Sequence, residues 1–548
     1  MTVDLLTTLA ALAAVISAVA LDCQPRDYGW GSFVCVCSPN RCDFVGDIGD
    51  LLSGAAVVFE SSKAGLRFAK TTTTFSETTD VADGDDSEVL LINSSRTYQR
   101  VLGFGGAFTD SVGINLNSLP TEMRDDILKS YYSKEGIEYN MGRIPLASTD
   151  FSVRKYTYDD SPDDFELKNF TLAHEDFDLK IPYIKKAMSL SGDYVWFFGS
   201  SWSSPAWMKT NGELEGLGFL KGQPGGPYYK TWAKYHVRFV QEYEKQGVPI
   251  WGMTTQNEPT SGFVPFYPWQ TLGFTPWSQR DFVKLDLGPA LEEAGYGEGK
   301  VKVMIFDDNR LFLPFWANVV LSDDEAAKYV HGVGVHWYKN NFIGPAVLDD
   351  VREDFPDKFI LATEACTGYE TTTVNKVKLG SWDRAERYAS DIIEDLNHGV
   401  GGWTDWNLVL NTEGGPNWVG NYVDSPIIVN ATAEEFYKQP MYYAMGHFSK
   451  FIPRGSIRIF SSMEQHNILD IFGKELEHTA FLRPDSAVVV VVLNRGDRNV
   501  KLKIKYLVSC VSFQKAIEKR SITTFIWKPE RSCAHHSQSS STVGAKFS

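Results

Sequence analysis

Between residues 98 and 406, short apolar runs alternate with longer amphipathic stretches, and this alternation constrains the fold more than any other feature of the chain. Short apolar runs bounded by turn residues predict buried strands, and apolar residues at helical spacing predict helices. The predicted strands span 100–108, 139–147, 194–200, 249–255, 301–306, 332–336, 358–363 and 399–406. The predicted helices between them include 120–132, 178–191, 231–246, 279–294 and 383–397.

Eight strand–helix units in about 310 residues are typical of a (β/α)₈ TIM barrel of the α/β class. The alternative is an open, doubly wound sheet, which commonly binds nucleotide phosphates at a glycine-rich turn after its first strand. The first strand here ends in Gly103-Phe104-Gly105-Gly106, which lacks the G-x-G-x-x-G spacing. The sequence therefore favours a catalytic barrel over residues 99–449.

The segments that flank the barrel alternate apolar and polar residues with a period of two, which predicts antiparallel strands. On the N-terminal side these strands are 56–60, 66–70 and 89–92, and on the C-terminal side they are 456–460, 479–482, 487–493, 500–504 and 523–527. So many strands need a core of their own. We expect both sets to form one accessory β-sandwich, from 53–98 plus 450–528, followed by a polar, disordered tail at 529–548.

The N-terminus carries an apolar run from Leu5 to Leu21 that contains the A-x-A cleavage pattern Ala18-Val19-Ala20. This pattern predicts a signal peptide over residues 1–20 and entry into the secretory pathway. The positive residues that usually precede such a run are missing, so a signal anchor is the alternative. Glycosylation sequons stand at Asn93, Asn169 and Asn430.

Four cysteines, Cys23, Cys35, Cys37 and Cys42, crowd into 20 residues after the proposed cleavage site. An even cluster of this kind in a secreted chain predicts two disulfides in a small N-terminal β region at 21–52. A zinc cluster is the alternative, although the cluster contains no C-x-x-C pair. The state of Cys510 and Cys533 stays open.

The formal net charge of −16 and the pI near 5.2 argue against a nucleic-acid partner, which requires a basic surface. The chain is rich in aromatic residues, with 15 Trp and 24 Tyr, whose flat faces suit stacking on sugar rings or contact with lipids.

Polar and aromatic side chains gather at the C-terminal ends of the predicted strands, where the active sites of barrel enzymes lie. They are Asp110, Asp150, Trp202, Asn257, Glu258, Asp307, Asp308, His336, Trp337, Glu364, Trp403, Asp405 and Trp406. Carboxylates that hold hydroxyl groups, together with indoles that cover C–H surfaces, suit a sugar. Asp307 and Asp308 are compatible with metal coordination, but we expect them to cap a helix.

Glu258 and Glu364 form a pair of glutamates, because they end the fourth and the seventh predicted strand and therefore face each other across the mouth of the barrel. Glycoside hydrolysis requires such a pair, one carboxyl group to protonate the leaving oxygen and one to meet the anomeric carbon. The spacing does not say which glutamate has which role, and two structural glutamates are the alternative.

Long motifs resemble the glucosylceramidases, or acid β-glucosidases, of glycoside hydrolase family 30 over residues 23–528. The motifs are GFGGAFTD at 103–110, RIPLASTDFS at 143–152, YTYDDSPDDF at 156–165, SSPAWMKTNG at 203–212, GFTPWSQRDF at 273–282, DEAAKYVHGVGVHWY at 324–338, GGWTDWNLVLNTEGGPNW at 401–418, VDSPIIV at 423–429 and YKQPMYYAMGHFSKFIP at 437–453. Motifs of this length are highly specific.

The resemblance implies that Glu258 is the general acid/base and Glu364 the nucleophile of a retaining double displacement, without cofactor or metal. The residues it implies for glucose binding are Asp150, Trp202, Asn257, Trp406 and Asn421. It further implies that Arg143 orients a catalytic carboxylate, that His336 and Tyr338 stand behind or beside the site, and that Trp403 is either core or ligand. It implies the disulfides Cys23–Cys35 and Cys37–Cys42.

The implied substrate is glucosylceramide at a membrane surface in the lysosome, with a saposin-like activator and anionic lipid as candidate partners. The alternatives are another family-30 specificity (β-xylosidase, β-fucosidase or β-1,6-glucanase) and an inactive sugar- or lipid-binding homologue. Two departures stand out. The first is Gln256, which replaces a Glu of the mammalian members and so removes a like charge near Glu258. The second is the aromatic content of the segments 214–226 and 263–269, whose side chains could meet a ceramide tail or pack on each other.

Overall fold

The computed structural model describes residues 23–77, 87–192, 194–370, 372, 374–464, 476–509 and 511–529. The predicted signal peptide lies outside these residues, and so do Cys510, Cys533 and all but the first residue of the predicted tail. In the part of the chain that is described, no helix has both the length and the apolar character that crossing a bilayer demands.

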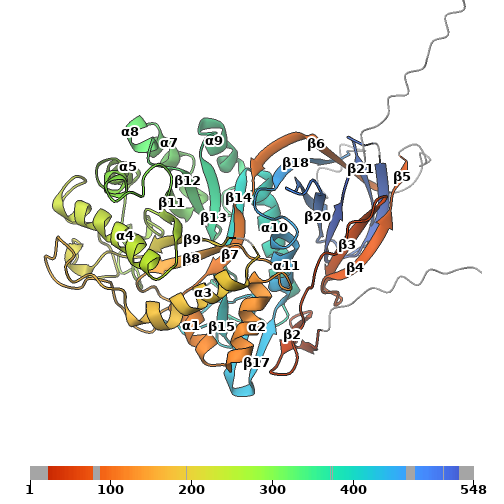
Figure 1. The fold of residues 1–548 in the computed structure, drawn as a ribbon, viewed down its shortest axis with the longest axis horizontal. Coiled ribbons are helices and arrows are strands. Elements are labelled where there is room, and N and C mark those ends of the chain that lie inside the picture. The colour runs from red at the N-terminus through yellow and green to blue at the C-terminus, as the bar shows by residue number, and fades with distance from the viewer. Residues whose placement is uncertain are drawn as a thin grey trace, which may run out of the picture.

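The centre of the molecule is a closed, parallel barrel, which confirms the predicted fold class (Figure 1). Its strands are β7 (Gly103–Ala107), β8 (Met141–Leu146), β9 (Trp196–Ser201), β10 (Ile250–Thr254), β11 (Lys302–Asn309), β12 (Gly332–His336), β13 (Phe359–Glu364) and β14 (Val400–Asn407). They pair in chain order, and β14 closes the ring on β7. Buried Met141, Phe198, Met304 and Leu361 pack together as one cluster of strand side chains, so the barrel has a filled interior.

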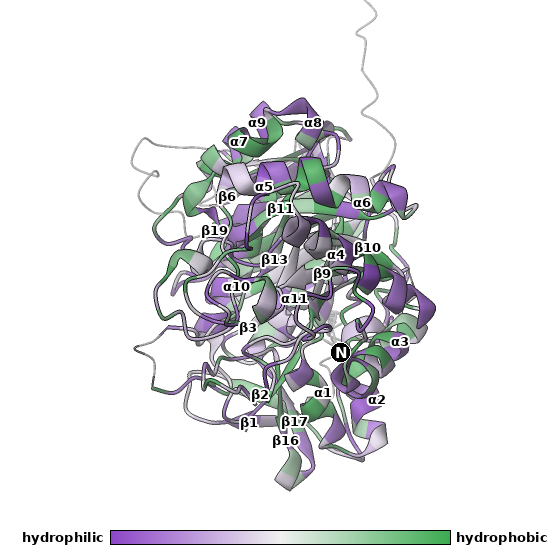
Figure 2. Ribbon diagram, turned by 90° about the vertical axis from the view of Figure 1, so that its left-hand side faces the viewer, coloured by the Kyte–Doolittle hydropathy of each residue, from purple (hydrophilic) through white to green (hydrophobic). Residues whose placement is uncertain are grey.

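Helices surround the barrel and present both hydrophobic and hydrophilic residues, as Figure 2 shows for α4 and α5. They are α1 (Asp110–Asn117), α2 (Thr121–Tyr132), α3 (Ile181–Leu190), α4 (Pro227–Lys245), α5 (Pro276–Phe282), α6 (Gly288–Glu293), α7 (Phe315–Leu321), α8 (Asp324–Ala327), α9 (Ala346–Asp354), α10 (Trp382–Asn397) and α11 (Pro440–Ser449). The predicted helices at 178–191 and 279–294 each include a π-helical turn, at Asp176–Lys180 and Val283–Leu287.

A β-sandwich built from both ends of the chain stands beside the barrel (Figure 1). Its strands are β3 (Ala55–Ser62), β4 (Ala69–Thr74), β5 (Ser76–Glu77), β6 (Glu88–Arg100), β18 (Ile457–Met463), β19 (Leu476–Leu482), β20 (Val488–Asn494), β21 (Val500–Tyr506), β22 (Val511–Ile517) and β23 (Ser521–Trp527). The ten-stranded sheet curves back on itself, so that β4 near one edge meets β22 near the other. Thr73 on β4 donates to the carbonyl of Gln514 on β22 at 3.4 Å. The sheet encloses an apolar core that includes Val58, Val490 and Trp527. The sequence prediction missed β22.

The N-terminal β region is a five-stranded sheet that takes strands from a distant part of the chain. The strands β1 (Pro25–Asp27) and β2 (Phe33–Cys37) continue into β17 (Glu435–Lys438), β16 (Ile427–Asn430) and β15 (Val409–Asn411). The sequence prediction assigned the last three strands to the barrel segment and did not recognise them as strands. The disulfides are Cys23–Cys35 and Cys37–Cys42, the pairing that the family resemblance implies.

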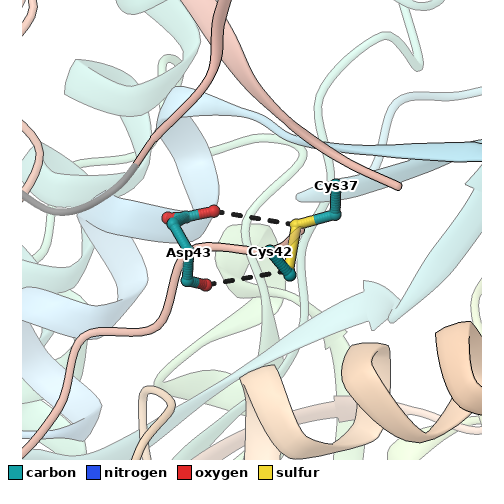
Figure 3. Close-up of side chains that lie close together, drawn as sticks. All are labelled: Cys37, Cys42 and Asp43. Atoms are coloured by element: carbon teal, nitrogen blue, oxygen red, sulfur yellow. Dashed lines mark hydrogen bonds between the residues drawn. A yellow bond between two sulfur atoms is a disulfide. The ribbon is translucent and has the colours of Figure 1, made fainter. Parts of the chain in front are cut away.

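The cysteine cluster is a disulfide site and not a zinc site. Cys37, Cys42 and Asp43 lie together (Figure 3), but the two sulfur atoms are bonded to each other. The carboxylate of Asp43 is also engaged, since it accepts a hydrogen bond from Tyr443 at 2.6 Å and pairs with buried Lys438 at 3.5 Å. Asp43 therefore fastens the disulfide region to β17 and α11.

Candidate active site

Arg143, in the middle of β8, is the centre of a buried network at the C-terminal ends of the strands. Its Nη1 donates to Oε2 of Glu364, and its Nη2 donates to Asn257 and to Asp307, both at 2.9 Å. Its Nε donates to the hydroxyl of Ser200 at 3.1 Å. Burial disfavours the charged guanidinium, but Asp307 and Glu364 outweigh it and raise the pKa of Arg143. Arg143 thus contacts a predicted catalytic carboxylate and orients it.

Glu364 is the last residue of β13, and both of its carboxylate oxygens accept strong hydrogen bonds. Oε2 accepts from Arg143, and Oε1 accepts from the hydroxyl of Tyr338 at 2.7 Å. Only 8% of the side chain is exposed. Charge-assisted bonds of this kind stabilise the carboxylate form and fix its orientation. Both properties suit a nucleophile.

Glu258 follows β10 and is held more loosely than Glu364. Its Oε1 lies 3.1 Å from Nδ1 of His336 and accepts from Nδ2 of Asn309 at 3.3 Å, whereas its Oε2 accepts from Tyr267 at 3.4 Å. Its side chain is 18% exposed. Oε1 thus receives two donors, and Oε2 only the long bond from Tyr267, so Oε2 is the less engaged of the two oxygens.

The backbone around Glu258 is strained, which is common at functional sites. Glu258 has φ +39°, and the neighbouring β11 has φ +72° at Phe306 and +57° at Asp307. The two segments are joined, since Glu258 N donates to the carbonyl of Asp307 at 2.9 Å. Left-handed conformations at such residues cost about 1–3 kcal/mol each, and the surrounding contacts maintain them.

His336 and Asp307 connect the two glutamates. Nε2 of His336 lies 3.1 Å from Asp307, which also accepts from Thr363 at 2.5 Å and from Arg143. Burial lowers the pKa of a histidine, but Glu364 and Asp307 outweigh it and raise the pKa of His336 to about 10. The imidazolium therefore donates from both nitrogens. Although burial opposes the charge of Asp307, Arg143 and His336 hold its pKa well below the usual range.

Asp307 and Asp308 do not cap a helix, which corrects the sequence prediction. Both belong to β11, and Asp307 is bound within the network just described. Asp308 accepts from the backbone and the hydroxyl of Thr260, at 3.0 and 2.7 Å. Burial, together with the charge of Glu258, raises the pKa of Asp308 to about 6. Asp308 thus anchors the loop that follows Glu258.

Asp150 forms a second polar group of the site with two amides of the loop before β16. Its Oδ2 accepts from Asn421 at 2.9 Å and from Asn417 at 3.1 Å. Burial raises the pKa of Asp150 to about 7. The hydrogen bond from Asn421 lowers this pKa, and the nearby Glu364 raises it further. Asp150 and Asn421, which were predicted together, lie together.

Trp202 and Trp406 form an indole pair beside Arg143. Their ring centroids are 5.0 Å apart with planes 16° from parallel, and the Arg143 guanidinium lies 4.9 Å from the Trp202 ring and 5.5 Å from the Trp406 ring. Phe151, next to Asp150, packs edge-on against Trp406 at 5.9 Å. The predicted aromatic and carboxylate residues thus belong to one site.

The side chain of Gln256 is fully buried and is directed at main-chain groups. Its Nε2 donates to the carbonyls of Ser201, Trp202 and Asn257 at 3.0, 2.8 and 3.0 Å, and its Oε1 accepts from Ser201 Oγ at 3.3 Å. These bonds join the ends of β9 and β10 and do not go to Glu258.

Other predicted residues at the strand ends are structural. Trp403 is core, because it is fully buried, donates to Asp391 at 3.0 Å and packs on Tyr388. Asp110 begins α1 and accepts from Ser152 at 2.5 Å. Cys366, which is not among the predicted site residues, is a buried thiol beside Tyr338.

Two surface cavities lie away from these residues. One of about 580 Å³ is lined by Trp277, Arg280 and Asp323, and one of about 450 Å³ by Trp30 and Arg384 among others. No predicted site residue lines either cavity. The candidate active site therefore rests on its connected side chains and not on cavity size.

Sequence reasoning missed several contributors to the site, namely Ser200, Tyr267, Asn309 and Asn417. Tyr267 and Asn417 stand in loops whose path a sequence does not give. Ser200 and Asn309 stand at the ends of β9 and β11, and this position was the signal that could have found them.

A (β/α)₈ barrel defines a glycoside hydrolase when its strand ends hold two glutamates in one hydrogen-bonded network, an indole pair and buried amides. The chain belongs to glycoside hydrolase family 30. The sequence profile of the glycosyl hydrolase family 30 TIM-barrel domain matches residues 101–452, and that of the family 30 β-sandwich domain matches residues 455–525. The family predicted from the motifs is thereby confirmed.

Named relatives cover nearly the whole chain. It is 45% identical over 513 residues to the lysosomal acid glucosylceramidase of Mus musculus, covering 93% of this chain and 96% of the relative. It is 44% identical over 534 residues to putative glucosylceramidase 4 of Caenorhabditis elegans, covering 96% and 99%. Among solved structures, SrfJ from Salmonella typhimurium matches with a TM-score of 0.77 and 26% identity, over 87% of this chain and 100% of that one.

Proposed function

We propose that this chain is a retaining β-glucosidase that hydrolyses glucosylceramide to glucose and ceramide. The observation that carries the proposal is the unequal environment of the two glutamates. Glu364 is held as a fixed carboxylate by Arg143 and Tyr338, whereas Glu258 keeps one oxygen with a single, long hydrogen bond. The glucosylceramidase names of the relatives at 44–45% identity support this substrate.

In the first step, the carboxylate of Glu364 attacks the anomeric carbon while Glu258 Oε2 gives its proton to the glycosidic oxygen. Ceramide leaves, and the sugar is bound to Glu364 as an ester. In the second step Glu258, now a carboxylate, removes a proton from water, which attacks the same carbon and displaces the Glu364 carboxylate, so that glucose leaves and both glutamates return to their first state. His336, positively charged, donates to Glu258 Oε1 in both steps and favours the carboxylate that forms between them.

The glucose ring would lie on Trp202 and Trp406, with its hydroxyl groups on Asp150, Asn257 and Asn421. The Oδ1 of Asn257 accepts from Arg143, so its amide nitrogen is available to the sugar 2-hydroxyl. Hydrogen bonds to this hydroxyl strengthen in the transition state of glycosidases. With a pKa of about 7, Asp150 is protonated in an acidic compartment and can donate to a sugar oxygen.

The proposed location is the lumen of the lysosome, reached through the secretory pathway. Two disulfides are consistent with an oxidising compartment. Asn169 is exposed and available for glycosylation, whereas Asn93 and Asn430 are half-buried. The name of the mouse relative supports the same location.

The lipid substrate would be met by an apolar rim that we define as Leu217, Phe263, Val264, Phe266, Leu311, Phe312 and Phe342. These side chains are 41–96% exposed and stand on the loops after the neighbouring strands β9, β10, β11 and β12. Part of the rim also packs on itself, since Phe219 contacts Phe263 edge-on at 4.8 Å. Exposed apolar side chains that border an active site mark a contact with lipid or protein. We propose that the rim contacts the bilayer, with a saposin-like activator and anionic lipid as further partners.

The test is release of glucose from glucosylceramide in vesicles below about pH 6, as in an acidic compartment. Vesicles with and without anionic lipid, and with and without a saposin, separate the proposed partners. Phe266→Ser, as the most exposed rim residue, should lower turnover on vesicles and leave turnover of a soluble aryl β-glucoside unchanged.

The stereochemistry and the specificity have separate tests. Proton NMR of the first-formed glucose should show the β anomer, and the α anomer would contradict the retaining mechanism. Preferential cleavage of a β-xyloside, a β-fucoside or a β-1,6-glucan would contradict the substrate and support another family-30 specificity. Failure of a mechanism-based β-glucoside inactivator to label Glu364 would support an inactive homologue.

A further inference from the structure

Gln256 lies where the ladder between β9 and β10 has ended. The last paired residues of that ladder are Gly199 and Met253. Beyond them one backbone bond joins the strand ends, from Asn257 N to the carbonyl of Ser201 at 2.9 Å. Two side chains add to it, since Thr254 donates to the hydroxyl of Ser200 at 2.8 Å and Gln256 donates to the carbonyl of Ser201 at 3.0 Å. The Gln256 amide thus replaces the missing rungs at the point where the chain turns into the cleft.

Gln256 binds the main chain of Trp202 and Asn257, two of the residues proposed to bind glucose, and of Ser201, which precedes Trp202. The amide NH₂ donates to the backbone of Trp202 and of Asn257 itself, and to the carbonyl of Ser201 before Trp202. The Trp202 indole lies on Trp406, and Asn257 accepts from Arg143. A change at Gln256 would therefore displace both Trp202, which is proposed to contact the glucose ring, and Asn257, which is proposed to bind the sugar 2-hydroxyl.

We propose that Gln256 is a positioning residue of the glucose pocket, and that its being an amide keeps the pocket assembled at every pH. The inference rests on the proposed β-glucosidase activity. An amide nitrogen donates two protons without titrating, whereas a carboxyl group donates one when neutral and none when ionised. An ionised side chain in this place would direct negative charge at three carbonyl oxygens, which burial makes costly.

The charged groups around Gln256 do not compensate for such a change. Arg143 on β8 is already shared among Glu364, Asp307 and Asn257. Glu258, two residues further along the chain, is another carboxyl group and not a cation. His336 on β12 donates to Glu258 and Asp307, and Asp150 and Asp308 are further carboxyl groups of the same strand ends.

The test is Gln256→Glu, assayed on an aryl β-glucoside from about pH 4 to about pH 8. At the acid end the carboxyl group is neutral, and we expect kcat/KM within about tenfold of the wild type, reflecting one lost hydrogen bond. Above the pKa of the new side chain, the ratio of wild-type to variant kcat/KM should rise about tenfold per pH unit. Gln256→Met, which cannot donate, should lower kcat/KM by a factor that does not change with pH, mainly through KM.

A matched control separates positioning from the general cost of a buried acid. Gln439 is also fully buried and donates, to Asp424 at 2.5 Å and to the carbonyl of Ser425 at 2.7 Å, outside the catalytic network. Gln439→Glu should lower the melting temperature as pH rises and leave the pH profile of kcat/KM as in the wild type. A Gln256→Glu profile parallel to the wild type overturns the proposal, as does a Gln439→Glu profile that changes in the same way.

A readout without turnover keeps this proposal distinct from the proposed function. Near-ultraviolet circular dichroism reports the packing of all aromatic side chains, to which the stacked Trp202–Trp406 pair contributes. The spectrum of Gln256→Glu should change reversibly with pH, while the spectra of the wild type and of Gln439→Glu below its melting temperature stay constant. If the wild type cleaves no β-glucoside but the dichroism changes as stated, the proposed function fails and the positioning role stands. If the wild type is active and the dichroism of the variant is constant with pH, the positioning role fails.

Discussion

The two sides of the cleft hold their glutamates in different ways. On the β13 side, Glu364 receives a guanidinium and a phenol, one on each oxygen, and is almost fully buried. On the β10 side, Glu258 receives three hydrogen bonds of 3.1–3.4 Å, has a left-handed backbone and is more than twice as exposed.

The difference fits the roles proposed for the two carboxyl groups. A nucleophile in a double displacement is needed as a carboxylate at a fixed distance from one carbon, and strong ionic hydrogen bonds provide this. An acid/base residue gains and loses a proton in each cycle, so bonds that stabilise one state strongly would hinder the other. A rigidly held carboxylate, as at Glu364 on β13, therefore suits the nucleophile, and a more loosely held carboxyl group, as at Glu258 after β10, suits the acid/base residue.

Glu364→Gln tests the rigid side and has the largest expected effect. Glutamine keeps one acceptor oxygen for Arg143, and its NH₂ group can donate to the Tyr338 hydroxyl, so the fold should persist, but a neutral amide cannot form the ester. We expect kcat to fall by at least about 10⁴-fold for every leaving group, as for other enzymes that lose their nucleophile. Steady-state kinetics on aryl β-glucosides measure this. Wild-type turnover in the variant would show that the assignment is wrong.

Glu258→Gln tests the adaptable side, and its effect should depend on the leaving group. For a poor leaving group such as ceramide we expect a loss of about 10²–10⁴-fold, the usual contribution of general acid–base catalysis. For an aryl group that leaves without a proton, the first step should be nearly normal and a burst of phenol should precede slow turnover. Equal losses on all substrates would contradict the division of roles.

His336 belongs to both sides, and its charge makes the stability of the site depend on pH. Its folded pKa of about 10 lies above the ordinary value of 6.5, so its contribution is fully present below pH 6.5 and is lost as pH rises through 10. The contribution is at most about 5 kcal/mol, and less because its partners titrate with it. Chemical denaturation should show stability falling between these pH values in the wild type and a smaller fall in His336→Gln.

Much of this architecture could be predicted from local sequence signals. Apolar runs with turn residues after them marked all the barrel strands, and strand ends marked both glutamates. The strands β15–β17 were missed, although β16 and β17 form a local hairpin, and the strand that continues this sheet, β2, comes from the opposite end of the chain. Only the folded sheet brings β17 and β2 together, so a local pattern does not contain the pairing.

The roles of Asp307 and Asp308 were missed for a different reason. Side chains in a strand alternate between the two faces, so neighbouring aspartates should point in opposite directions. The pairing of β11 with β12 shifts register between Phe306 and Asp308, and both Phe306 and Asp307 have positive φ. Alternation therefore does not predict which aspartate meets Arg143. The same limit applies to Gln256, whose partners are backbone carbonyls on another strand.

Tyr338→Phe and Tyr267→Phe form the finest test of the comparison, because each removes one hydroxyl from one glutamate. The Tyr338 hydroxyl lies 2.7 Å from Glu364 and that of Tyr267 lies 3.4 Å from Glu258. A hydrogen bond to a charged group contributes about 1.5–3 kcal/mol, so Tyr338→Phe should lower kcat by about 10-fold or more. The longer bond is at the limit of hydrogen-bond geometry, so Tyr267→Phe should change kcat by less than about 3-fold. The two variants lose the same atom, and the reverse order of their effects would mean that Glu258 is the more tightly controlled carboxyl group.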